Sequence, residues 1–342
     1  MAKKFLCFLC PLFFLQAIHI EAQYVRPVKI KMVWDYIQNQ EANANPGEKI
    51  VHPSLDIISP TWFSIGGGDG EILSLADSGY VKWAHDRGLK VWPVFENSSD
   101  NSLTITALFT KNKRERIADE LIKCTRYYGF DGININFEGL RDETGKYYEL
   151  FIAELYEKLK PLGITLSVDV PLPLNDIHGI YDVKLIAKNC DFIVLMGYDQ
   201  HHPYSPVIGS VAAIGWVKQG IEEALQYMPS EKVILGIPFY TRVWLEDYRS
   251  GRTEWTSELV GMKEAYELFE NNARIWERDR EMEQIYAEYD VGNSCYKAWL
   301  EDEHSISLKL DTINDYDLAG MSAWRRGWEW KETWDMIEAY FE

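Results

Sequence analysis

The stretch FDGININFE, residues 130–138, decides the fold expected for this chain. Apolar Ile and Phe residues alternate in it with three polar residues, Asn134, Asn136 and Glu138. Such alternation is typical of a β-strand, because successive side chains of a strand point to opposite faces. A strand with one apolar face, one polar face and an acid at its end predicts a polar interior that opens at Glu138.

Seven other short apolar runs, rich in Val and Ile, occur along the chain, and helical patterns lie between most of them. Continuous apolar runs are typical of parallel strands that are buried on both faces. Eight such strands with intervening helices favour a closed (β/α)8 barrel, an α/β fold, over a doubly wound open sheet. The expected strands span residues 28–36, 55–65, 89–97, 129–138, 164–172, 190–199, 232–240 and 318–324, and the clearest helical patterns span 114–128, 147–163 and 211–228.

The connection formed by residues 241–317 is too long for a single loop between a strand and a helix. It contains one helical stretch, residues 262–273, and two strand-like runs, residues 283–290 and 295–302, joined by VGNS. We therefore expect a small α+β insertion between strands seven and eight, on the face of the barrel where the strands end.

Residues 1–22 have the layout of a secretory signal peptide. Lys3 and Lys4 precede an apolar stretch, and Ala22 is a candidate cleavage point. An N-terminal anchor that is never cut is the alternative. After cleavage, we expect residues 23–342 to form one barrel, secreted to the periplasm or the outside of the cell, with no membrane span and as a monomer.

The formal net charge of −18 argues against nucleic acid or an anionic membrane as a partner, because both carry phosphate that this chain would repel. Outside the first 22 residues, Cys124, Cys190 and Cys295 match no metal motif and no dense disulfide framework. We expect no cofactor and no metal. A metal hydrolase built on His201 and His202 is an alternative, but adjacent histidines point in different directions unless the loop turns.

In a (β/α)8 barrel, residues at the C-terminal ends of the strands form the active site. Asn134, Asn136 and Glu138 are therefore candidates, unless the two amides satisfy each other and Glu138 pairs with a basic residue. Other strand ends add aromatic rings, which suit the apolar faces of sugars, and polar groups for their hydroxyls. These further candidates are Trp34, Trp62, Tyr198, Asp199, Gln200, Tyr240, Arg242 and Trp324. Arg242 has an alternative role as a structural cation for Asp199 or Glu138.

These residues together resemble glycoside hydrolase family 18, the chitinase family, and its subgroup similar to spore cortex-fragment-lytic N-acetylglucosaminidases. The family motif D-x-x-D-x-D-x-E appears here as Asp131-Gly-Ile-Asn134-Ile-Asn136-Phe-Glu138, and M-x-Y-D appears as Met196-Gly-Tyr198-Asp199. The stretches SPTWFS, LMGYDQHHPYSPVIGS and SAWRRG also look like that subgroup. The main departure is Asn136, because the family has Asp two positions before the catalytic Glu.

The resemblance implies hydrolysis of β-linked N-acetylglucosamine glycans, either peptidoglycan or chitin-like, in which the substrate's acetamide is the nucleophile. It implies that Glu138 is the acid and then the base, that residue 136 holds the acetamide, and that Tyr198 donates a hydrogen bond to it. Asp131 and Asn134 would support these three, and the other candidates would bind glycan. Asn136 lacks the charge of the family's Asp, so the alternative is a chitinase-like lectin that binds glycans without cutting them.

Overall fold

Eight parallel strands close into a barrel in the computed structural model, which describes residues 28–174, 179–247 and 254–341. β1 pairs with β2 on one side and with β15 on the other, so that Met32 lies between Ile57 and Ser322 and the sheet has no open edge. The predicted (β/α)8 fold is confirmed, whereas the expected signal peptide lies outside the described residues. The barrel strands are β1 (Ile30–Asp35), β2 (Ile57–Ile65), β4 and β5 (Lys90–Val91 and Val94–Glu96), β6 (Gly132–Asn136), β7 (Thr165–Pro171), β8 (Phe192–Met196), β9 (Val233–Pro238) and β15 (Gly320–Trp324), and β3 (Ile72–Ser74) pairs with β2.

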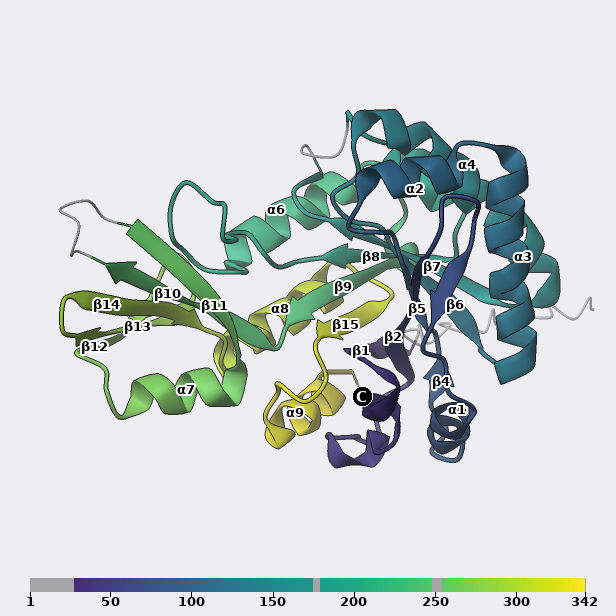
Figure 1. Cartoon of the computed structure of the whole chain (residues 1–342). Coiled ribbons are helices and arrows are strands. Elements are labelled where there is room, and N and C mark those ends of the chain that lie inside the picture. The colour runs from purple at the N-terminus through teal and green to yellow at the C-terminus, as the bar shows by residue number, and fades with distance from the viewer. Residues whose placement is uncertain (1–27, 175–178, 248–253, 342) are drawn as a thin grey trace, which may run out of the picture.

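Helices cover the outside of the barrel (Figure 1). α3 (Lys111–Tyr128) buries Ile117 and Leu121 and ends at Gly129, whose φ of 80° is unfavourable for other residues. The other helices are α1 (Ser78–His85), α2 (Asn101–Leu108), α4 (Asp142–Leu159), α5 (Val183–Lys188), α6 (Ile214–Ala224), α7 (Met262–Glu270), α8 (Glu303–Asp315) and α9 (Lys331–Phe341). No helix among the described residues is long and apolar enough to span a bilayer.

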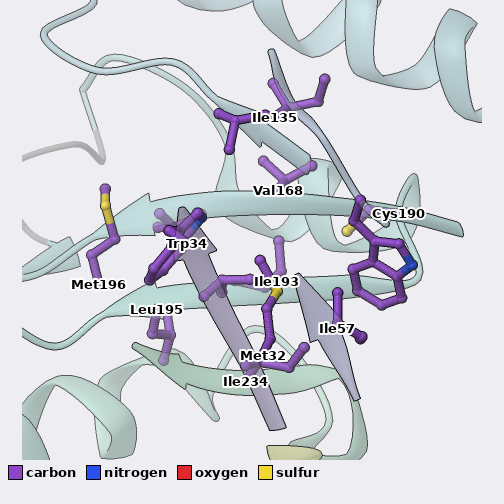
Figure 2. Close-up of a cluster of buried hydrophobic side chains, with 14 of the residues drawn as sticks. Met32, Trp34, Ile57, Ile135, Val168, Cys190, Ile193, Leu195, Met196 and Ile234 are labelled. Carbon is purple, nitrogen blue, oxygen red and sulfur yellow. The ribbon is translucent and has the colours of Figure 1, made fainter. Parts of the chain in front are cut away.

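One large apolar core joins the strands to these helices. Figure 2 shows part of it, where Met32 and Trp34 of β1 lie in one cluster with Ile193 and Leu195 of β8 and Ile234 of β9. Burial of this much apolar surface supplies the main stabilising free energy. The barrel is therefore a packed scaffold, on which the polar residues at the strand ends are held in place.

The expected α+β insertion between the last two barrel strands is confirmed as a second sheet with α7 on it, and it extends to the left of the barrel in Figure 1. Its antiparallel order is β11-β10-β14-β13-β12, with β10 at Tyr240–Asp247, β11 at Glu254–Gly261, β12 at Ile275–Asp279, β13 at Gln284–Val291 and β14 at Ser294–Leu300. The sequence indicated β13, β14 and α7 but not the other three strands. α8 follows the insertion and packs its Ile306 and Leu310 into the barrel core.

A fully buried ion pair fastens the insertion to the barrel. Lys309 of α8 donates to both carboxylate oxygens of Glu301, at 2.9 and 3.0 Å, and both side chains are at most 1% exposed. Gln284 of β13 and Ser305 donate to the same carboxylate at 2.7 and 2.6 Å. Gln284 also accepts a hydrogen bond from Ser210, in the segment that follows β8. The network therefore links three parts of the chain that are distant in sequence.

We predict that Lys309→Met destabilises the protein by about 3–5 kcal/mol, because Glu301 would remain buried without its cation. The measurement is chemical denaturation followed by circular dichroism. Lys82→Met is the matched control, because Lys82 pairs with Asp86 on an exposed surface of α1 and little change is expected there. Equal stability of Lys309→Met and the wild type would show that the pair does not hold the insertion.

Candidate active site

The end of β6 places Asn136 and Glu138 at the mouth of the barrel, the end where the C-termini of the barrel strands emerge. The Asn136 side chain donates from Nδ2 to Oε1 of Glu138 at 2.8 Å. Its other polar atom, Oδ1, is buried and has no hydrogen-bond partner among the described residues. A buried acceptor without a donor is costly, and an incoming N–H group would satisfy it.

Deeper in the barrel, Asn134 is fully buried and fully hydrogen-bonded. It accepts from Trp34 Nε1 of β1 at 3.0 Å and donates to Ser167 and Asp169 of β7 at 3.0 and 2.6 Å. The alternative that Asn134 and Asn136 satisfy each other is therefore not what the structure has. Asn134 thereby fixes the side chains of its three partners, and Trp34, which is 2% exposed, presents almost none of its ring to the mouth.

The backbone of Glu138 is held by a residue that is not among the candidates expected from the sequence. Asn97, just after β5, accepts from the Glu138 backbone N–H and donates to the Glu138 carbonyl oxygen, both at 2.9 Å. Gly139 follows with a φ of 61°, which turns the chain away from the strand. These contacts fix the direction in which the Glu138 side chain leaves β6.

Tyr198 and Asp199 come from the end of β8 and face the first strand of the insertion. Asp199 accepts from the Tyr240 hydroxyl at 2.8 Å and from the Arg242 guanidinium at 3.3 Å. Arg242 is 5% exposed, and in this arrangement its guanidinium is paired with Asp199. The Tyr198 hydroxyl makes no hydrogen bond to any residue that the structure describes, and its ring packs edge-on against Trp34 and Tyr240.

The remaining candidates differ in how far they reach the mouth. Trp324 is half-buried and its ring lies 6.0 Å from Trp34 and 6.1 Å from Tyr36. Trp62 is 2% exposed, packs on Tyr80 of α1 and donates to Asn43, so most of its ring is used in packing against the helix layer. Gln200 is half-buried, and its side-chain oxygen accepts from the Ala213 backbone N–H at 3.0 Å.

Asp131 lies at the opposite end of β6 from the mouth. It accepts from the Val91 backbone N–H at 2.8 Å and from His85 at 3.0 Å, which fixes the start of the strand. His201 contacts the carbonyl oxygen of Ser210, so its ring is used within the loop after β8. Among the residues that the structure describes, no three His, Cys, Asp or Glu side chains are arranged to hold a metal ion.

Two pockets open at the mouth, one on each side of β6. One, of about 220 Å³, is lined by Glu138, Tyr198, Asp199, Gln200 and Trp216 among others. The other, of about 610 Å³, is lined by Tyr36, Thr61, Trp62, Ser64 and Glu96 among others. The first pocket contains Glu138 and the second contains Glu96, and two sugar-sized spaces at the same barrel end suit an extended ligand that crosses it.

Three carboxyl groups, those of Glu138, Glu96 and Asp169, lie close enough to interact electrostatically, and burial favours their protonated forms. The pKa of Glu138 is raised, mainly because surrounding protein atoms shield its carboxyl group from water, although the residue as a whole is exposed. The hydrogen bond from Asn136 opposes this rise in pKa, and repulsion from Asp199 adds to it. Burial, followed by repulsion from Glu138, raises the pKa of Glu96 from an ordinary 4.5 to about 7. Burial also holds the pKa of Asp169 well above its ordinary value, and the hydrogen bond from Asn134 opposes that shift.

Glu96 and Asp169 are not among the site residues expected from the sequence, although each carries a usable signal there. Glu96 is the second-last residue of the third predicted strand, in VFEN, and Asp169 interrupts a Val-rich run in SVDVP. An acid within an apolar strand is the same kind of signal that singled out Glu138. What the sequence lacked was the register, which decides whether these acids face the interior or the helices.

Comparison with known proteins agrees with the family resemblance of the sequence motifs. Residues 60–328 match the model of the glycosyl hydrolases family 18. The uncharacterized glycosylase YvbX of Bacillus subtilis is 27% identical over 280 residues, which cover 79% of this chain and 80% of that protein. The cortical fragment-lytic enzyme of the same organism is 26% identical over 234 residues, or 67% of this chain, and the match spans about half of that enzyme, 54%.

Among solved structures, the spore cortex-lytic enzyme SleL of Bacillus cereus superposes with a TM-score of 0.81 at 20% identity, over 93% of this chain and 75% of that one. At this level of identity, the similarity to SleL shows a shared fold. The family model covers most of the chain, from β2 through the turn after β15, and so includes the strand that carries Glu138. The chain therefore belongs to glycosyl hydrolase family 18.

Proposed function

We propose that this protein is a secreted hydrolase of β-linked N-acetylglucosamine glycans, peptidoglycan or chitin-like, that uses the substrate's acetamide as nucleophile and retains the anomeric configuration. The observation that carries the proposal is the arrangement at the mouth: Glu138 and Tyr198 line one sugar-sized pocket, Asn136 donates to Glu138, and a second such pocket opens at the same end of the barrel. The similarity to a relative that is named a cortical fragment-lytic enzyme supports this substrate class. The proposed location depends on residues 1–22, whose sequence has the layout of a signal peptide.

In the first step, the Glu138 carboxyl group gives its proton to the glycosidic oxygen as the bond between that oxygen and the anomeric carbon breaks. The acetamide oxygen forms the new bond to the anomeric carbon. In the second step, Glu138, now a carboxylate, takes a proton from water, and the water oxygen displaces the acetamide. Glu138 is thereby protonated again, and no other reactant is needed.

Asn136 and Tyr198 act on the acetamide in this scheme. The buried, unpaired Oδ1 of Asn136 accepts the acetamide N–H, which orients its oxygen toward the anomeric carbon. Burial raises the pKa of Tyr198 well above its ordinary value, so its hydroxyl stays a donor to the acetamide oxygen. Asn136 adds no negative charge as the ring that forms becomes positive, and loss of such a partner costs about 10²–10³ in rate.

The neutral side chain at position 136 also favours a second candidate function. A glycan-binding protein needs the two pockets and the amide contact but no acid. Both functions predict binding of N-acetylglucosamine oligomers, and they differ in turnover. Incubation of the protein with chito-oligosaccharides and with purified peptidoglycan, followed by mass spectrometry of new reducing ends, separates them.

We predict that Glu138→Gln lowers hydrolysis by about 10²-fold or more, because the amide keeps the shape of the acid but has no proton to transfer. Affinity for the oligosaccharide, measured by calorimetry, should stay near that of the wild type. Glu157→Gln, on the exposed side of α4, is the matched control and should change neither quantity. Hydrolysis by Glu138→Gln at the wild-type rate would eliminate Glu138 as the acid.

We predict that Tyr198→Phe lowers kcat by about 10²-fold and weakens binding much less, because its hydroxyl is needed mainly as charge develops on the acetamide. Steady-state kinetics and calorimetry with one oligomer provide the two measurements. Equal losses in kcat and affinity would mean that Tyr198 contacts only the ground state.

A further inference from the structure

The end of β5 lies directly beside the end of β6, where the acid is. In the parallel register of these strands, Val94 pairs with Asn134 and Glu96 pairs with Asn136. Paired residues of neighbouring strands point to the same face of a sheet, at a strand separation of about 4.8 Å. The Glu96 side chain therefore points to the inner, polar side of the barrel, next to Asn136.

Glu96 is half-buried, and its carboxyl group has no hydrogen bond or ion pair among the described residues. It also lines the 610 Å³ pocket that opens at the mouth. A partly buried carboxylate without a cation is unfavourable, and such groups are commonly retained at functional sites. The next residue, Asn97, holds the backbone of Glu138, so β5 both positions that acid and places a second acid near it.

β7 mirrors this arrangement on the other side of β6. Asp169 is 1% exposed, it accepts from Asn134, and its second oxygen has no partner among the described residues. The family motif has acids at the positions of Asn134 and Asn136, both on the strand of the catalytic Glu. Here two acids, Glu96 and Asp169, lie instead on the two strands that flank it.

We propose that Glu96 is a positioning residue for the reaction and that it forms, with Glu138, a pair of like-charged groups, the acid pair. The acid pair keeps one proton at the mouth as the pH rises toward neutral. This inference rests on the proposed function. Two carboxylates close together repel, so the pair releases its second proton only at a higher pH than either acid would alone.

The same repulsion serves both steps of the proposed reaction. Before the first step, it keeps one proton in the acid pair, and the form that reacts has this proton on Glu138, with Glu96 charged, for transfer to the glycosidic oxygen. After that transfer both members are charged, which makes Glu138 a stronger base toward water. The hydrogen bond from Asn136 to Glu138 lies between the two acids and orients Glu138.

Other groups also act on the acid pair. The charged and titratable side chains that interact with it or share its pockets are Asp169 of β7, Tyr181 before α5, Tyr198 and Asp199 after β8, and Tyr36 after β1; Tyr240 and Arg242 of β10 contact Asp199, and Arg325 after β15 contacts Tyr36. Arg242 is paired with Asp199, and Arg325 lies over the rings of Tyr36 and Trp328. No cation among the described residues makes an ion pair with Glu96 or Glu138, so repulsion between the two is not neutralised locally.

The test is the pH dependence of kcat/KM for the full chain with an N-acetylglucosamine oligomer. Activity falls as the pH rises through the loss of the last proton of the acid pair. Glu96→Gln removes one negative charge, so this fall should move to lower pH by about 0.5–1 pH unit. The double variant Glu96→Gln/Asn136→Asp returns a carboxylate beside Glu138, so the fall in activity should move back to higher pH. Glu157→Gln should leave the pH of this fall unchanged.

A second measurement does not need turnover. NMR titration of ¹³C-labelled glutamate carboxyl groups follows both acids in the wild type and in each single variant. Glu138→Gln should lower the midpoint of Glu96, and Glu96→Gln should lower that of Glu138. Midpoints that do not respond to each other would overturn the proposal, whether or not the protein is active. Coupled midpoints in a wild type that cuts no glycan would keep the acid pair and reject the proposed hydrolysis.

Discussion

The hydrogen bonds of Asn134 organise the interior on which the candidate site depends. A fully buried amide has to satisfy its donors and its acceptor inside the barrel, and Asn134 does so with Trp34 of β1 and with Ser167 and Asp169 of β7. These partners come from strands on both sides of the barrel. They fix which face of β6 points inward. Because side chains alternate along a strand, the side chains of Asn136 and Glu138 then point to the same inner side as Asn134.

Charge at the mouth is arranged differently from what the family motif alone indicates. Both positions that carry Asp in the motif carry Asn here, so β6 retains Glu138 as its one acid at the barrel end. Glu96 and Asp169 lie on the neighbouring strands, and burial raises the pKa of each. A site can thus keep several coupled carboxyl groups while the strand that defines the family keeps only one.

The insertion contributes to the site as well as to the shape of the molecule. Its first strand, β10, brings Tyr240 and Arg242 to Asp199, and the buried pair of Glu301 and Lys309 ties the same sheet to the segment after β8. Asp199 has a φ of 59°, a left-handed conformation that is unusual outside glycine. The contacts from β10 hold Asp199 in that conformation, beside the pocket that contains Glu138 and Tyr198.

The sequence by itself determined the eight strands, the insertion between the last two, and the acid at the end of β6, because alternation and apolar runs are local properties that burial imposes on each segment. It did not determine the strands β10, β11 and β12. β10 begins only two residues after β9 ends, so the two read as one apolar run, and β11 and β12 are largely exposed and carry no continuous apolar face. It also did not reveal Glu96, Asn97 or Asp169 as neighbours of Glu138. Their proximity depends on the register between strands that are far apart in sequence, and only the closed barrel fixes that register.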